Sequence, residues 1–91
     1  MIPREKVETF RQYLREEFPG WEVADSDDFD RISWKFRVAN ESTIQVVYVE
    51  RRFWDIHEDT KKALINMGLS KFMKDNEGKH VFVGTADLTA P

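Results

Sequence analysis

Two successive runs of alternating residues, from Arg31 to Arg52, constrain this chain more than any other part of its sequence. In the first run, one side carries Ile32, Trp34, Phe36 and Val38. The other side carries Arg31, Ser33, Lys35 and Arg37. Successive side chains of a strand point to opposite faces of a sheet, so this run predicts a strand with one core face and one polar face.

The second run follows a loop at residues 39–43 and alternates in the same way. One side carries Ile44, Val46 and Tyr48, and the other carries Gln45, Val47, Val49 and Arg51. The two runs predict a β-hairpin with a mixed face of Lys35, Arg37, Val47, Val49 and Arg51. This mixture of apolar and basic side chains is typical of neither a buried core nor a solvent-exposed surface. The sequence therefore predicts that this face binds a partner.

Length and composition limit the number of domains, the cysteine chemistry and the membrane spans that this chain can have. A chain of 91 residues is one domain's worth, so residues 1–91 are expected to form a single domain. The chain has no cysteine, which excludes disulfides and thiolate chemistry and fits a reducing compartment. Its longest uninterrupted apolar stretch is residues 46–49, too short for a membrane span. We therefore expect a soluble, cytoplasmic protein without a membrane partner.

Charge is unevenly distributed along the chain. The net charge is −3, and the first thirty residues hold 9 acidic but only 4 basic side chains. The basic residues concentrate in the hairpin and at Arg51 and Arg52. A basic field over the whole protein is missing, so any binding of nucleic acid has to be local.

Helical and strand patterns flank the hairpin. A stripe spaced for one helix face follows Pro3 and ends before Pro19 and Gly20: Val7, Phe10, Leu14 and Phe18. Residues 21–24 predict a short strand, and the acidic residues 25–30 predict a loop.

A second helix is expected to follow the hairpin. Asp55 is its expected N-cap, Glu58 the capping-box partner, and Gly68 the residue that ends it. Residues 69–74 fit a strand or a short helical turn, and the strand is favoured; a further strand is expected at residues 80–84. Residues 85–91 are expected to fray. The predicted class is α+β, in the order α-β-β-β-α-β-β, with an antiparallel or mixed sheet and both helices packed on one face.

Catalytic and cofactor signals are weak. His57 and His80 lie in different elements without a nucleophile motif, and the four glycines never cluster into a phosphate-binding loop. The acidic residues 25–30 lack the glycine and the final acid of a calcium loop. The sequence therefore predicts no catalytic residue, no cofactor and no metal ligand.

One enzymatic alternative rests on a resemblance. The order α-β-β-β-α-β resembles the minimal core of restriction-endonuclease-like nucleases, with Asp30 before one strand and Glu50-Arg51-Arg52 at the end of the next. An acid-x-Arg stands here where those enzymes have acid-x-Lys. The resemblance implies a divalent-metal site at Asp30 and Glu50. The spacing of the strand, however, puts Glu50 and Arg52 on the side of the helices, where the alternative is an ion pair at the end of the strand. The α-β-β-β-α order and Lys61-Lys62-Ala63 are also similar to double-stranded-RNA-binding domains.

These observations favour a non-catalytic binding module that acts through the mixed face, by self-association or by docking to a larger protein. The predicted binding residues are Lys35, Arg37, Val47, Val49, Arg51 and Arg52. The alternative is a nucleic-acid-acting domain, either a single-strand binder or the metal-dependent nuclease. In the single-strand binder Phe53 and Trp54 would stack on bases, although a place in the core is favoured for both.

Overall fold

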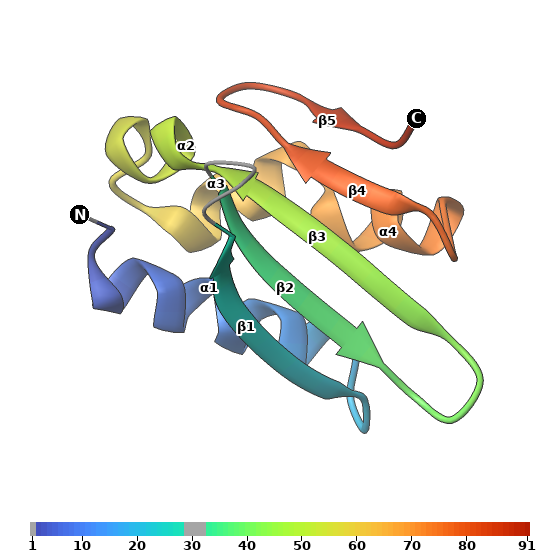
Figure 1. The fold of residues 1–91 in the computed structure, drawn as a ribbon. Coiled ribbons are helices and arrows are strands. Elements are labelled where there is room, and N and C mark those ends of the chain that lie inside the picture. The colour runs from blue at the N-terminus through green and yellow to red at the C-terminus, as the bar shows by residue number, and fades with distance from the viewer. Residues whose placement is uncertain (1, 29–32) are drawn as a thin grey trace.

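A mixed β-sheet forms one layer of this protein and helices form the other (Figure 1). The computed structural model describes residues 2–28 and 33–91, and within these ranges the sheet has five strands in the order β1-β2-β3-β4-β5. The strands are β1 Glu22–Asp28, β2 Ser33–Ala39, β3 Ile44–Glu50, β4 His80–Val83 and β5 Leu88–Thr89. Strands β3 and β4 pair in parallel, and the other neighbours pair antiparallel.

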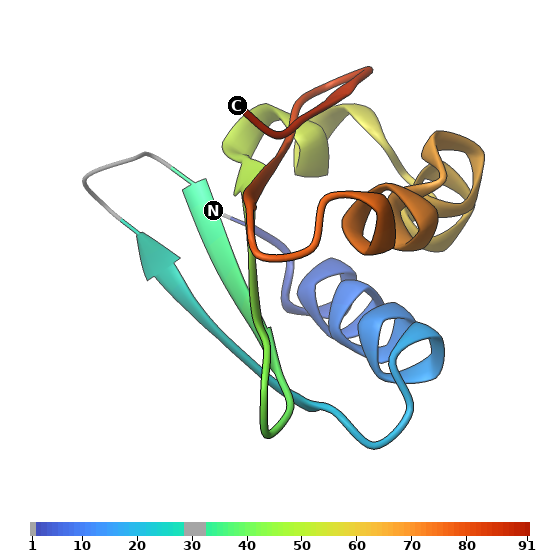
Figure 2. The same ribbon diagram turned by 90° about the vertical axis from the view of Figure 1, so that its right-hand side faces the viewer.

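The helices lie together on one face of this sheet. They are α1 Arg4–Glu17, α2 Arg51–Ile56, α3 Thr60–Met67 and α4 Leu69–Asp75. Figure 2 shows α1, α3 and α4 on one side and α2 at the end of the sheet, while no helix of the described residues lies on the opposite face. The predicted α+β class with a mixed sheet and helices on one face is confirmed. None of the described helices has the length and apolar composition needed to cross a bilayer.

Aromatic side chains fill the space between the two layers. Phe10 of α1 stacks on Phe36 of β2, with ring centroids 4.4 Å apart. Phe53 and Trp54 are both fully buried and pack edge to face at 5.5 Å. They belong to the core, as the sequence favoured, and are not available to stack on bases. Each large apolar side chain buried in this way contributes about 1.5–3 kcal/mol to folding.

The structure corrects the prediction of one long second helix. Residues 51–67 form two helices, and the N-cap of α3 is Asp59, whose Oδ1 accepts a hydrogen bond from the backbone N of Lys62 at 3.0 Å. Asp55 lies inside α2, and within the described part of the chain its side chain caps no helix. Gly68 ends α3 with a left-handed φ of 71°, as predicted, because glycine adopts this conformation without a steric cost.

Three further boundaries differ from the sequence interpretation. The segment at residues 69–74, predicted as a strand, belongs to α4, where Leu69 and Met73 are one helical turn apart and both fully buried. The acidic segment predicted as a loop continues β1 as far as Asp28. Leu88 and Thr89 pair with β4, in the segment expected to fray.

Residues 29–32, which include Asp30, Arg31 and Ile32 of the sequence interpretation, lie outside the described residues.

Candidate interaction face

The register of the β2–β3 hairpin decides which side chains share a face. Phe36 pairs with Val47, and Trp34 pairs with Val49. Directly paired residues of neighbouring strands point to the same side of a sheet. Val47 and Val49 therefore lie on the helix side, where both are 0% exposed. The prediction that these two valines share a face with Lys35 and Arg37 was wrong.

A single loop residue accounts for this error. The loop spans residues 40–43 rather than 39–43, because Ala39 still pairs with Ile44. Asn40 closes this shorter loop: its Oδ1 accepts hydrogen bonds from the backbone N of Ser42 at 2.9 Å and of Thr43 at 2.7 Å. A shift of one residue in register moves every side chain of a strand to the other face.

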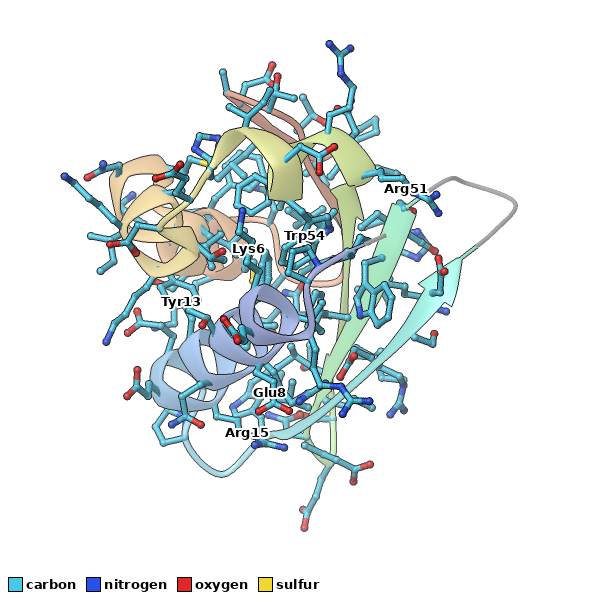
Figure 3. All side chains as sticks on the ribbon, turned by 90° about the vertical axis from the view of Figure 1, so that its left-hand side faces the viewer. Lys6, Glu8, Tyr13, Arg15, Arg51 and Trp54 are labelled. Atoms are coloured by element: carbon cyan, nitrogen blue, oxygen red, sulfur yellow. The ribbon has the colours of Figure 1, made fainter. Side chains whose placement is uncertain are left out.

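The two arginines of the predicted site lie away from the hairpin face. Strand β3 ends at Glu50, and Arg51 and Arg52 form the first turn of α2. Arg51 Nη2 lies 4.0 Å from Asp27 Oδ1, near the end of the sheet where α2 begins (Figure 3). Arg52 is exposed. Of the six predicted binding residues, the structure places only Lys35 and Arg37 together on the uncovered face.

The uncovered face has a different membership, and we call it the open sheet face. Lys35, Tyr48 and Phe82 form one row across β2, β3 and β4, and Arg37, Val46 and His80 form the next row. The rings of Tyr48 and Phe82 stack at 5.1 Å with an interplanar angle of 18°. Ile44, 52% exposed, extends the same face beyond Val46. The open sheet face comprises Lys35, Arg37, Ile44, Val46, Tyr48, His80 and Phe82.

A hollow of about 550 Å³ lies at one end of this face, and we call it the sheet-end hollow. It is lined by Ser33, Tyr48, Glu50, Phe82, Val83, Gly84, Asp87 and Thr89. An ideal Cβ on Gly84 would lie 2.7 Å from Asp87 Oδ1 and 3.8 Å from Glu50 Oε2. Two carboxylates therefore lie over the same glycine, and the missing side chain of Gly84 leaves room for them.

Ser33 adds a polar atom to this hollow. Its side chain is only 5% exposed, and within the described residues its Oγ has no hydrogen-bond partner. Ser33 pairs directly with Glu50 across the β2–β3 ladder, so the hydroxyl and the Glu50 carboxylate are on the same face. Sequence reasoning missed this group, because Glu50 and Asp87 are far apart in the chain and meet through the turn between β4 and β5.

The residues on which the nuclease resemblance rests do not form one site. Asp30 lies outside the described residues. Glu50 lines the hollow on the open side of the sheet, not the helix side, and Arg52 is on α2. In the described ranges, no group of three or more His, Cys, Asp or Glu side chains is arranged to hold a metal ion.

The histidine considered for catalysis and the lysine of the RNA-binding hypothesis make ordinary structural contacts. His57 Nε2 is 2.6 Å from the carbonyl oxygen of Thr85, and its ring packs on Phe53 at 4.8 Å. Lys61, from the segment similar to double-stranded-RNA-binding domains, lies 3.6 Å from Glu16 of α1. Its charge is thus partly balanced by a carboxylate.

Comparison with known proteins gives no relative: no family model matches the chain, and no curated protein or solved structure is significantly similar to it.

Proposed function

We propose that this chain is a small non-catalytic interaction module that binds protein through its open sheet face. The observation that carries the proposal is the apolar centre of that face, which no described helix covers: Val46 and Phe82 are half-buried and Ile44 is largely exposed. Lys35 and Arg37 border this centre. Aromatic and apolar residues with an arginine at the rim are typical of protein interfaces. The proposed location is the cytoplasm, as predicted from the sequence.

A second candidate, binding of single-stranded nucleic acid, is favoured by the row of Lys35, Tyr48 and Phe82. A basic side chain beside aromatic rings on a sheet is an arrangement on which bases stack. Two observations weigh against it. Tyr48 is only 6% exposed, so a base has little access to its ring. Glu50 and Asp87 border Phe82 in the hollow and repel phosphates.

The first test measures self-association, the simplest form of protein binding by this face. Sedimentation of the purified chain at micromolar and millimolar concentrations is expected to show a concentration-dependent oligomer. Val46→Glu is expected to abolish the oligomer, because it forces a carboxylate into a desolvated apolar contact. Ile65→Glu is the matched control, since Ile65 is 58% exposed on α3. Equal loss with both variants would contradict the proposal.

The second test separates the two function classes. A labelled single-stranded oligonucleotide is titrated with the chain at low and at moderate salt. The interaction module is expected to bind it weakly or not at all. Tight binding that falls steeply with salt, and that is weakened by Lys35→Ala and Arg37→Ala, would favour the nucleic-acid function instead.

A further inference from the structure

The two ends of the open sheet face carry groups that can pair with each other. Arg37 is exposed on β2 at one end, where Glu22 and Glu41 line the same surface hollow, and Glu50 and Asp87 border the sheet-end hollow at the other end. Ser33 in the hollow is four residues from Arg37 along β2, a separation of about 13 Å. Among the described residues, Arg37 has no acidic group within ion-pair distance, and Glu50 and Asp87 have no basic group within that distance.

The hollow has the chemistry of a guanidinium site. A guanidinium presents several N–H donors in one plane and no acceptor. The hollow offers the matching acceptors, namely the carboxylates of Glu50 and Asp87 and the unpartnered Oγ of Ser33. The half-buried ring of Phe82 forms an apolar wall on which a guanidinium stacks. A buried hydroxyl without a partner gains from a donor that enters with the ligand.

We propose that the occupant of the hollow is Arg37 of a second copy of this chain. This inference rests on the proposed function, and it names the partner and the contact. A two-fold axis that lies in the interface and crosses the strands at Tyr48 exchanges the Arg37 end of one copy with the hollow end of the other. Each copy then supplies one Arg37 and one hollow, and the contact closes as a dimer. The rings of Tyr48 and Phe82 lie near the axis, and Val46 lies inside the contact.

Complementary charge reversals test this pairing. One variant is Arg37→Glu, and the other combines Glu50→Arg with Asp87→Arg. Each variant alone is expected to weaken self-association at least about tenfold, because like charges meet at both contacts of its homodimer. An equimolar mixture is expected to regain association as a heterodimer, since both contacts are again complementary. Sedimentation of the mixture, with one variant fluorescently labelled, measures the recovery, and circular dichroism checks that each variant is folded.

Two single substitutions sharpen the test. Arg52→Glu makes the same change of charge on the exposed first turn of α2, and it is expected to leave association unchanged. Gly84→Ala keeps every charge but puts a Cβ only 2.7 Å from Asp87 Oδ1, and the backbone of Gly84 does not have a positive φ. It is expected to displace the carboxylate and to weaken association.

The outcomes separate this inference from the proposed function. Association that is lost with Val46→Glu but unchanged by Arg37→Glu would overturn the pairing and leave the interaction face in place. Equal weakening by Arg37→Glu and Arg52→Glu, or no recovery in the mixture, would also overturn the pairing. A wild-type chain that remains monomeric at millimolar concentration would overturn the pairing and self-association, and a different protein would then be the partner of the open sheet face. Recovery in the mixture, with no effect of Arg52→Glu, supports the pairing.

Discussion

Arg11 on α1 binds Asp25 on β1 through two hydrogen bonds: Nε donates to Oδ1 at 2.7 Å and Nη2 donates to Oδ2 at 3.1 Å. Trp34 Nε1 donates to the same carboxylate at 2.9 Å. Burial of the Asp25 carboxyl raises its pKa, but the hydrogen bonds from Arg11 and Trp34 and the charge of Arg11 lower it by more. The pKa of Asp25 therefore lies below its ordinary value, and the ionised carboxylate joins the first helix to the edge strand.

This contact predicts a pH-dependent contribution to stability. Because the pKa of Asp25 is lower in the folded than in the unfolded chain, the contribution is present above the ordinary value of 3.8 and is lost as pH falls through the folded pKa. Asp25→Ala is expected to lower the free energy of unfolding by about 2 kcal/mol at neutral pH. Urea unfolding of both proteins along a pH series would show the difference shrinking below about pH 4. A constant difference would contradict the prediction.

The caps of the helices after the hairpin give a second prediction. Asp59→Ala removes the acceptor for the backbone N of Lys62 and is expected to lower the free energy of unfolding by about 1 kcal/mol. Asp55→Ala, at the position where the sequence predicted the cap, is expected to change it by less than about 0.5 kcal/mol. Thermal unfolding of the two variants compares them directly. A larger loss of stability with Asp55→Ala than with Asp59→Ala would mean that α2 and α3 form one continuous helix capped at Asp55.

The sequence predicted correctly those elements that depend on residues close together in the chain. The helical spacing up to Phe18 fixed α1, and Gly68 fixed the end of α3. The first run of the hairpin was interpreted correctly at Phe36 and Val38, both 0% exposed. Trp34 on the same face is only half-buried, at the edge of the core beside Asp25.

The second run was assigned to the wrong face because the loop before it is one residue shorter than the sequence indicates, so Gln45 lies on the helix side. Gln45 is 1% exposed, and its Nε2 donates a hydrogen bond to the carbonyl oxygen of Met73 at 3.1 Å. That partner is in α4, a helix that the sequence interpretation replaced with a strand. The sheet-end hollow was unpredictable for a related reason. Its acids, Glu50 and Asp87, meet only because β4 pairs in parallel with β3 after a crossover of three helices.

The core aromatic Trp54 gives a third prediction. Its side chain is fully buried and packs on Phe10 at 5.5 Å, so Trp54→Ala is expected to lower the free energy of unfolding by about 3–5 kcal/mol. Its Nε1 has no hydrogen-bond partner among the described residues. Trp54→Phe removes this unpaired donor together with part of the ring, and the two effects offset each other. Its expected cost is below about 1.5 kcal/mol, measured by urea unfolding. Equal losses in both variants would reveal a partner for the indole.

Neighbouring valines on β3 give the most direct test of the hairpin register. Val47→Glu places a carboxylate in the core and is expected to lower the free energy of unfolding by roughly 4 kcal/mol or more. Val46→Glu places the same carboxylate on the open sheet face and is expected to cost less than about 1 kcal/mol.

Urea unfolding at low protein concentration compares these two variants without a contribution from self-association. The Val47→Glu protein is also expected to gain stability relative to wild type as pH falls, because a buried carboxyl group is tolerated when it is protonated. The Val46→Glu protein is expected to show a much weaker dependence. If the order of the two variants were reversed, Val46 would be the core residue. The five-residue loop of the sequence interpretation, with its mixed face of Lys35, Arg37, Val47 and Val49, would then be correct.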